Sequence, residues 1–465
     1  MNAIAELESF LADYRYVYLG LFALNCYGLA RHMAFDLLVL RDYGLEESWA
    51  AARIEAELIS WEHETRRRIR GRGVGTRPLF EGDIGARVSS ALLSQGCTRP
   101  VMTSSATQEL EALVAASGGK LRTLTARTAV AGPLGNKTTL RRILPALGIE
   151  PIPHVLCSAT ALDFHTLKRR FGLPFVVQLP TGAGGSGTFF ISDQQELRSL
   201  QERLGPQEII ASKYISGLAP NINAVTLDDD VLVSYPSVQL VGVPQCVPWE
   251  SGYCGNDFAA TRLLPSGAVQ AIYEQTRRIG RWMGKQGYRG MWGIDFVVDG
   301  QRVYPVEVNA RFQGSTRMLT ELQYLDGQAP LVLAHVAGFL DGGQSLLNRI
   351  RTHWSEPQPL DGAQIDLKSL EQDVSVVRGS LRSGVYAWDG ARGIYRREGM
   401  SIADCQHPHE FTISGTVPRW GTRVEPGAVL VRIQTPREIC DGQSNRLQPW
   451  ASELCTWVYR ALSLS

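Results

Sequence analysis

The first part of the chain alternates apolar runs with charged, helix-like stretches. Residues 16–22 form a short apolar run that predicts a buried strand. Residues 46–70 are long and charged, and they predict helix. Residues 107–116 have the spacing of an amphipathic helix. This alternation predicts an irregular α/β unit over residues 1–130.

The rest of the chain divides into two further units. Residues 131–345 contain the motifs described below. Residues 346–465 show short alternating runs with many glycine turns, followed by a closing helix over residues 450–462. Residues 357–362 have the composition of a linker. The predicted fold class is therefore α/β (α+β), ending in a small β-rich domain.

Composition and charge argue against several functions. The 465 residues carry 47 Lys and Arg against 46 Asp and Glu, so a net charge of +1 gives no extended field for nucleic acid or an anionic membrane. The apolar stretch at residues 17–30 contains Asn25 and is shorter than the ~20 residues of a membrane span. Residues 1–13 lack the basic region of a secretory signal. We expect a cytoplasmic protein that contacts neither nucleic acid nor membrane.

Cysteine and histidine usage adds little chemistry. The eight cysteines include no CxxC pair, and Cys246 and Cys254 are expected to be reduced and buried rather than joined in a disulfide. His407 and His409 resemble a small metal pair, but two histidines without a third ligand are usually a solvated loop.

The most informative segment is residues 293–312, two β-rich runs around an Asp-Gly turn that predict a hairpin. Glu307 and Asn309 are two apart on the second strand and share a face. If Asp295 lies opposite Glu307, three oxygen-bearing side chains converge, which suits Mg²⁺. This pairing predicts a loop of three or five residues. Arg311 continues the same face and could bind a phosphoryl group or a carboxylate. An exposed hairpin with solvated acids is the alternative.

A glycine-rich loop joins two predicted strands within residues 172–191. Glycines let backbone N–H groups approach an anion. Because the loop is followed by a strand, not by a helix, it does not fit a P-loop or a dinucleotide-binding turn. It predicts a flap over nucleotide phosphates, with a plain glycine hairpin as the alternative. Lys137 opens a predicted helix over residues 138–147 and could bring positive charge to the same phosphates.

In this order and spacing, the elements resemble the ATP-grasp superfamily. The family's lysine and its Gly-Ile-Pro-x-Pro segment are matched by Lys137 and residues 148–153, and its Glu-x-Asn-x-Arg by residues 307–311. The resemblance covers roughly residues 120–330. It implies an ATP-grasp domain with a flap at about residues 165–217, preceded by an α/β pre-ATP-grasp domain.

The resemblance also implies a ligand set. Mg²⁺ is expected on Asp295, Glu307 and Asn309, with Arg311 and Lys137 stabilising charge during catalysis. The expected ATP-contacting residues are Lys137, Gln178, Gly184, Gly185, Ser186, Gly187, Ser212, Lys213, Tyr214 and Ile215. Two of them depart from the family pattern, which usually has lysine at Gln178 and glutamate at Ser212. A nucleotide-binding protein without turnover therefore stays open.

The activity implied by the resemblance is an ADP-forming C–N ligase. Such an enzyme activates a small carboxylate as an acyl phosphate and joins it to an amine. The flanking units resemble those of the pheganomycin-type peptide ligases, which implies amino acid or peptide ligation in natural-product biosynthesis, and a homodimer is expected from the family. A bicarbonate-dependent carboxylase is an alternative, although no Met-Lys-Met biotin attachment site is present.

Four further polar residues are candidates for substrate contacts. Asn221 and Asn223 share a strand face and could line the nucleotide or acceptor site, or could serve cross-strand structure. Asp257 and Arg317 could contact substrate, but ordinary structural roles are expected for both.

Overall fold

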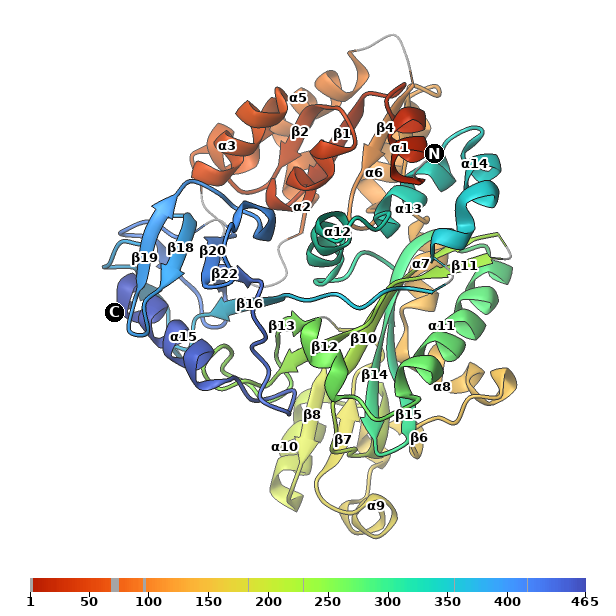
Figure 1. Ribbon diagram of the computed structural model, residues 1–465. Coiled ribbons are helices and arrows are strands. Elements are labelled where there is room, and N and C mark those ends of the chain that lie inside the picture. Colours follow the sequence, from red (N-terminus) through yellow and green to blue (C-terminus); the bar gives the residue numbers. More distant parts are fainter. Residues whose placement is uncertain are drawn as a thin grey trace.

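The computed structural model describes residues 3–67, 75–94, 98–182, 184–228, 230–354, 356–415 and 417–465. Their strands form a parallel sheet near the N-terminus, a small antiparallel sheet, a long antiparallel sheet and a two-stranded pair. The parallel sheet lies at the top of Figure 1, the small sheet projects at the bottom, and the C-terminal elements lie at the left. This is the mixed α/β architecture predicted from the sequence.

The parallel sheet has the order β3-β2-β1-β4-β5. Its strands are β1 (Tyr16–Gly20), β2 (Phe35–Leu40), β3 (Glu57–Ser60), β4 (Arg99–Met102) and β5 (Leu121–Thr123). The helices of this part are α1 (Ala3–Leu11), α2 (Leu24–Tyr27), α3 (Leu45–Ile54), α4 (Trp61–Thr65), α5 (Gly82–Leu93) and α6 (Gln108–Ala116). Every residue of β1 is buried, as expected for a parallel strand covered on both faces.

The helix predicted over residues 46–70 is wrong in its middle. Helix α3 ends at Ile54, where Glu55 takes a left-handed conformation with φ of 55°. The chain then forms β3, whose residues pair in parallel with β2, and Ile59 is fully buried there. The stabilisation gained when an apolar strand pairs with the edge of β2 is larger than the local preference of these residues for helix. Residues 68–70 lie outside the described part of the chain.

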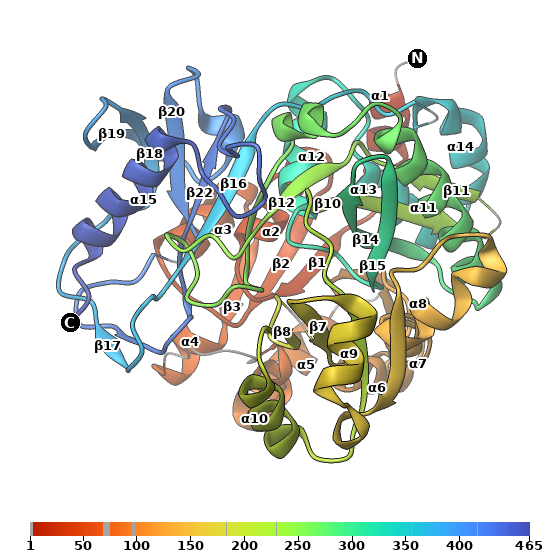
Figure 2. The ribbon, with the colours of Figure 1, turned by 90° about the horizontal axis from the view of Figure 1, so that it is seen from below.

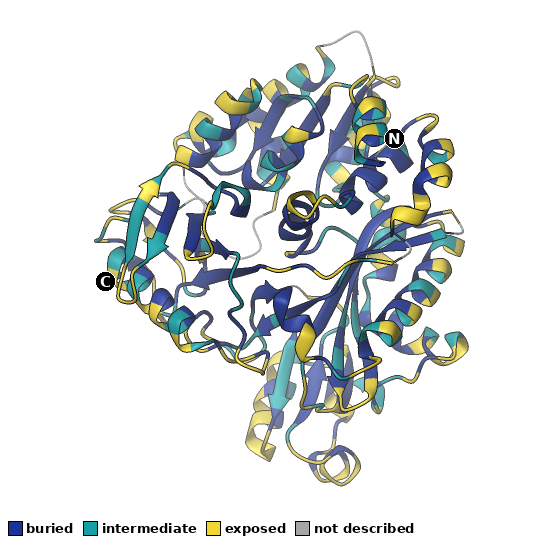
Figure 3. Cartoon of the chain, viewed as in Figure 1, coloured by how far each residue is buried: buried dark blue, intermediate teal, exposed yellow. Residues whose placement is uncertain are grey.

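The small antiparallel sheet has the order β6-β9-β7-β8 and forms the predicted flap lobe. Its elements are β6 (His154–Ser158), α9 (Phe164–Phe171), β7 (Phe175–Gln178), β8 (Thr188–Ile191), α10 (Gln194–Leu204) and β9 (Glu208–Lys213). Asp163 and Asp193 cap the two helices with side-chain acceptors. The helices turn apolar faces to the sheet and exposed faces outward, and the lobe projects from the body (Figures 2 and 3).

The long antiparallel sheet has the path β15-β14-β10-β12-β13-β16-β22-β20-β18-β19, with β11 beside β10. Its first strands are β10 (Pro220–Leu227), β11 (Asp230–Val233), β12 (Ser237–Val241), β13 (Tyr253–Asp257), β14 (Gly290–Asp299) and β15 (Arg302–Asn309). The later strands are β16 (Ala363–Lys368), β18 (Gly384–Trp388), β19 (Gly393–Arg397), β20 (Glu410–Ser414) and β22 (Val429–Thr435), and β17 (Ser375–Val376) pairs with β21 (Arg423–Val424). Pairing of β13 with β16 carries one sheet across the predicted boundary at residue 346.

Helices cover both faces of this sheet. They are α7 (Thr128–Leu134), α8 (Lys137–Ile143), α11 (Ala268–Lys285), α12 (Thr316–Leu325), α13 (Leu331–Phe339), α14 (Gly343–Ile350) and α15 (Pro449–Leu462). Residues of α13 share one hydrophobic core with β1, β2, β10 and β14, so this helix joins the N-terminal unit to the sheet. Pro145 lies where the predicted helix 138–147 gives way to a 3-10 turn. In the described chain, no helix is long and apolar enough to cross a membrane.

Candidate nucleotide and metal site

The hairpin of β14 and β15 brings the predicted metal ligands together by an unexpected route. Its turn has two residues, because Asp299 pairs with Arg302, so the predicted loop of three or five residues is wrong. A register shift between Asp295 and Phe296 then leaves Val306 as an extra residue on β15. This bulge restores the pairing of Asp295 with Glu307.

The three candidate ligands lie together, with Asn309 hydrogen-bonded to Asp295 and Glu307 paired opposite Asp295 on the neighbouring strand. Asn309 Nδ2 donates to Asp295 Oδ2 at 3.2 Å. Gln239 Nε2 and Gln313 Nε2 each donate to Asp295 Oδ1 at 2.9 Å. Burial, and then the charge of Glu307, raise the pKa of Asp295 to about 7. Two neighbouring carboxylates in a low dielectric repel each other, and a divalent cation between them would relieve that repulsion.

Lys137 lies against this cluster rather than in the open cavity. Its side chain is 3% exposed and its Nζ lies 2.9 Å from Glu307 Oε1. The residue opens α8, where Asn136 caps the helix through its side chain. The structure therefore places the predicted phosphate-binding lysine as the ion-pair partner of a candidate metal ligand.

Arg311 links the cluster to the adjoining chain. Its Nη2 donates to Asn309 Oδ1 at 3.1 Å and its Nη1 to the carbonyl of Phe312 at 2.8 Å. Two residues further on, the Gln313 side chain crosses directly over Gly293, where a Cβ atom would lie 2.0 Å from it. Glycine at position 293 therefore gives Gln313 access to Asp295.

A cavity of about 290 Å³ opens beside the cluster and is walled by the flap lobe. Of the predicted site residues, it is lined by Gln178, Gly184, Gly185, Ser212, Lys213, Tyr214, Ile215, Asp295, Glu307, Asn309 and Arg311. Ser186, Gly187 and Lys137 are not among its lining residues. Apolar side chains from both lobes, including Ile152, Val176 and Phe296, complete the wall. A space with an apolar part and a carboxylate cluster suits a nucleotide.

The glycine-rich loop rests on the segment that precedes β13. Ser251 Oγ lies 2.9 Å from the carbonyl oxygen of Gly185 and 3.0 Å from that of Thr188. Gly185 has φ of 85°, and a Cβ atom there would lie 1.7 Å from the Ser251 carbonyl oxygen. Only glycine allows this approach, which holds the loop over the cavity.

The two departures from the family pattern lie on neighbouring strands inside the cavity. Gln178 on β7 and Ser212 on β9 are 5% and 3% exposed. Gln178 Nε2 donates to Thr188 Oγ1 at 3.2 Å, so its amide stabilises the base of the flap. Tyr214 packs edge-on against Phe190 with ring centroids 5.6 Å apart. Lys213 ends β9, and it lines the cavity together with Tyr214 and Ile215, which follow it.

A second cavity of about 250 Å³ adjoins the first and shares Arg311, Gln313 and Gly314 with it. Three parts of the chain line it. The N-terminal unit contributes Tyr18, Phe22 and Asn25, α12 contributes Arg317 and Glu321, and β22 contributes Arg432. The predicted candidate Arg317 therefore lines a space that adjoins the first cavity.

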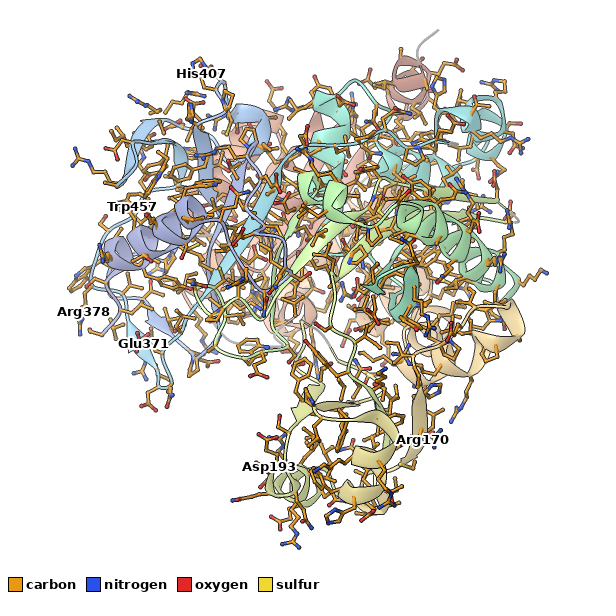
Figure 4. The ribbon with its side chains drawn as sticks, turned by 60° about the horizontal axis from the view of Figure 1, so that its bottom comes forward. Arg170, Asp193, Glu371, Arg378, His407 and Trp457 are labelled. Carbon is orange, nitrogen blue, oxygen red and sulfur yellow. The ribbon has the colours of Figure 1, made fainter. Side chains whose placement is uncertain are left out.

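The other polar candidates are structural or distant. Asn221 lines the first cavity, whereas Asn223 is buried and its Nδ2 donates to Ser315 Oγ at 3.0 Å. The carboxylate of Asp257 accepts the backbone N–H groups of residues 260, 439 and 440, which is a structural role. His407 lies at the periphery, remote from the flap lobe that carries Arg170 and Asp193 (Figure 4).

The described residues contain no second candidate metal centre. Within the described ranges, no group of three or more His, Cys, Asp or Glu could hold a metal ion. The Asp295 cluster instead combines two carboxylates with an amide. Cys246 and Cys254 are free, as predicted, and Cys246 Sγ lies 4.0 Å from Cys455 Sγ.

Sequence reasoning missed Gln239, Ser251 and Gln313. Gln313 continues the every-second-residue pattern of Glu307, Asn309 and Arg311, and this spacing could have revealed it. Gln239 and Ser251 reach the site from β12 and from the segment before β13, and no local motif marks them.

The first cavity thus lies between the flap lobe and a carboxylate-bearing hairpin. A family model described as the ATP-grasp domain matches residues 135–315. The chain therefore contains an ATP-grasp domain, and the fold predicted from the sequence is confirmed.

Among curated proteins, the chain is similar to a [butirosin acyl-carrier protein]–L-glutamate ligase of Niallia circulans, at 24% identity over 276 residues. The match covers 58% of this chain and 60% of that protein. A D-alanine–D-alanine ligase of Moorella thermoacetica is 27% identical over 188 residues, which is 38% of this chain and 59% of the relative. A carbamoyl phosphate synthase large chain of Thermus thermophilus is 28% identical over 36% of this chain, and only 16% of its own length is matched.

Solved structures share the fold over nearly the whole chain. The biotin carboxylase domain of a Hydrogenobacter thermophilus 2-oxoglutarate carboxylase, solved with ADP, magnesium-ADP and bicarbonate, has a TM-score of 0.55 at 13% identity. The similarity covers 91% of this chain and 86% of that one. A carboxyaminoimidazole ribonucleotide synthase of Aspergillus clavatus, solved with ATP, has a TM-score of 0.52 at 14% identity and covers 96% and 99%.

Proposed function

We propose that this chain is an ATP-dependent, ADP-forming ligase that joins a small carboxylate to the amine of an amino acid or peptide. One observation carries the proposal. The cavity beneath the flap ends at the Asp295, Glu307 and Asn309 cluster and meets a second cavity at Arg311. A nucleotide in the first space and a second substrate in the other would meet at this guanidinium.

The residues of the cluster fit Mg²⁺. Carboxylate and amide oxygens are hard ligands, and Mg²⁺ is usually held by one or two carboxylates together with substrate phosphates. Asp295, Glu307 and Asn309 would hold it. When bound, it would supply positive charge against the phosphate oxygens. Lys137 keeps Glu307 in place from behind, at 2.9 Å.

The protein's own groups position the reactants. The backbone of Gly184 and Gly185 covers the cavity and excludes water from an acyl phosphate. In the proposed reaction, a carboxylate oxygen bonds to the γ-phosphorus of ATP as the bond to ADP breaks. The deprotonated amine then attacks the acyl carbon, and phosphate leaves. Arg311, which lines both cavities, would stabilise the oxyanion that forms on that carbon.

Some of the similar curated proteins support this proposal. Two of them bear the names of ligases that act on glutamate and D-alanine. The matches cover only about 60% of each of these two relatives, so the substrates of this chain are part of the proposal. The same proposal has three finer parts. The reaction is a pheganomycin-type peptide ligation in natural-product biosynthesis, the protein is cytoplasmic, and it forms a homodimer.

The test is ADP release from ATP and Mg²⁺ with a panel of carboxylates, amino acids and peptides. The Glu307→Gln variant removes one charge from the candidate metal site, and Glu274→Gln, on the exposed face of α11, is its matched control. We expect amine-dependent ADP release that falls by at least about 100-fold in Glu307→Gln only. Bicarbonate-dependent release without an amine would instead indicate a carboxylase, and ATP binding without release would indicate a non-catalytic binder.

A further inference from the structure

The second cavity contains an arginine whose hydrogen-bonding edge is unsatisfied. Arg317 is 6% exposed and lines this cavity from α12. Its Nη1 lies 3.4 Å from Glu321 Oε1 and 3.3 Å from Gln434 Oε1. Among the described residues, its Nε and Nη2 have no hydrogen-bond partner. These two N–H groups form one edge of the planar guanidinium, and this edge matches the two oxygens of a carboxylate.

The other arginines of the cavity are already engaged. Arg432 donates from Nε and Nη2 to the two oxygens of Asp366, at 2.5 and 2.9 Å. Arg311 donates to Asn309 and to the Phe312 carbonyl. Arg317 is therefore the arginine of this cavity in which two buried N–H groups, Nε and Nη2, have no partner among the described residues. Glu321 is already an anionic neighbour of Arg317 on the Nη1 side, but the buried Nε and Nη2 lack acceptors, and leaving buried donors unpaired is costly.

The charges and walls of the cavity narrow the ligand class. Three arginines line it, and the carboxylates of Glu321 and Asp366 balance two of them, so one positive charge remains to favour an anionic group. Leu21, Leu29 and Val332 add apolar wall. A volume of about 250 Å³ is below the roughly 300–1,000 Å³ typical of pockets for drug-sized ligands, so the ligand is small.

We propose that the second cavity binds the acceptor substrate as a free amino acid with an apolar side chain, whose α-carboxylate pairs with the Nε and Nη2 edge of Arg317. Its amine then faces Arg311, at the boundary with the first cavity. This inference rests on the proposed ligase function and specifies its acceptor. The acceptor's own carboxylate is held away from the nucleotide, so the carboxylate activated by ATP belongs to the other substrate.

The test compares amino acids with their amides, which have nearly the same size but lack the carboxylate. Binding of L-valine, L-leucine and L-phenylalanine, and of their amides, is measured by calorimetry on the full chain with ADP and Mg²⁺. We expect at least one acid to bind, and its amide to bind about 10- to 100-fold more weakly. Arg317→Gln should remove this preference, and Arg317→Lys should keep part of it. The exposed Arg349→Gln, on α14, is the matched control and should retain it.

The outcomes separate this inference from the proposed function. Equal binding of acid and amide by the wild-type protein, an unchanged preference in Arg317→Gln, or no binding of any pair would overturn the inference. The comparison on wild-type protein needs no variant and so does not depend on the folding of Arg317→Gln. Acid-selective binding without amine-dependent ADP release would keep the inference for the cavity and overturn the ligase. Amine-dependent ADP release that is equally fast with amino acids and with their amides would keep the ligase and overturn the inference for the cavity.

Discussion

Replacing Gly185 by alanine should loosen the flap over the nucleotide cavity. The added Cβ would lie 1.7 Å from the carbonyl oxygen of Ser251, whereas real Cβ contacts essentially never fall below 3.0 Å. The loop and Ser251 must therefore separate by more than about 1 Å. This movement breaks the hydrogen bond that Ser251 Oγ donates to the loop carbonyls of Gly185 and Thr188.

The expected size of the effect follows from that contact. One hydrogen bond contributes about 0.5–1.5 kcal/mol, and further loss of fit brings the cost of closure to about 1–2 kcal/mol. ATP should then bind about 5- to 30-fold more weakly. The assay is displacement of a fluorescent ATP analogue by ATP in the presence of Mg²⁺, with thermal unfolding as a check that the fold is intact.

Gly184→Ala is the matched control for this experiment. Gly184 also has a positive φ, of 57°, but a Cβ atom there would meet nothing within 4 Å. Both variants share the left-handed backbone penalty of roughly 1 kcal/mol, so the extra weakening in Gly185→Ala isolates the contact with Ser251. Equal ATP affinities for the two alanine variants would refute the closed-flap reasoning.

Three further predictions concern neighbouring contacts. Ser251→Ala should weaken ATP binding less than Gly185→Ala, by about 2- to 10-fold, because it removes the hydrogen bond without a clash; an unchanged Kd would count against this contact. Lys137→Met should lower Tm by several degrees, because it leaves Glu307 without its ion-pair partner. Adding Glu307→Gln to this variant should restore much of the lost Tm, and additive losses in the double variant would contradict the pairing. Hydrogen bonds from Arg397 lower the pKa of Glu410 to about 2, so its contribution of about 2 kcal/mol is present above pH 4.5 and is lost toward pH 2. Glu410→Gln should therefore destabilise the protein in urea unfolding at pH 7 and progressively less from pH 4.5 downward, and a pH-independent difference would refute this.

The sequence allowed the hairpin to be predicted because its signal is local. Two β-rich runs around Asp299 and Gly300, with polar side chains at every second position, specify both the turn and the shared face of Glu307 and Asn309. The flap strands and the capped helix α6 were predicted for the same reason. The strand β3 was missed because its pairing partner, β2, lies some twenty residues away and outweighs a helical pattern.

The bulge in β15 was missed, although one residue pointed to it. Counting loop residues assumes a regular ladder, and this assumption produced the wrong turn length. Pro305 sits in β15, where it cannot donate to a ladder. Proline inside a strand indicates an edge strand or a bulge, and here β15 is the edge strand and the extra residue Val306 follows directly. If Pro305 is taken as the sign of a bulge, the sequence alone is compatible with a two-residue turn that still places Asp295 opposite Glu307.

The second cavity could not have been predicted by any such local reasoning. Its walls come from β1 and α2, from α12 and from β22, so residues such as Phe22, Arg317 and Arg432 lie far apart in the sequence. They meet because α13 shares a core with the parallel sheet and because β13 and β16 join the C-terminal strands to the long sheet. The origin of these walls in three units also indicates which residues could change the substrate specificity. The Asp295, Glu307 and Asn309 cluster is built on one hairpin, whereas a change in any of the three units would reshape the second cavity without touching Asp295 or Glu307.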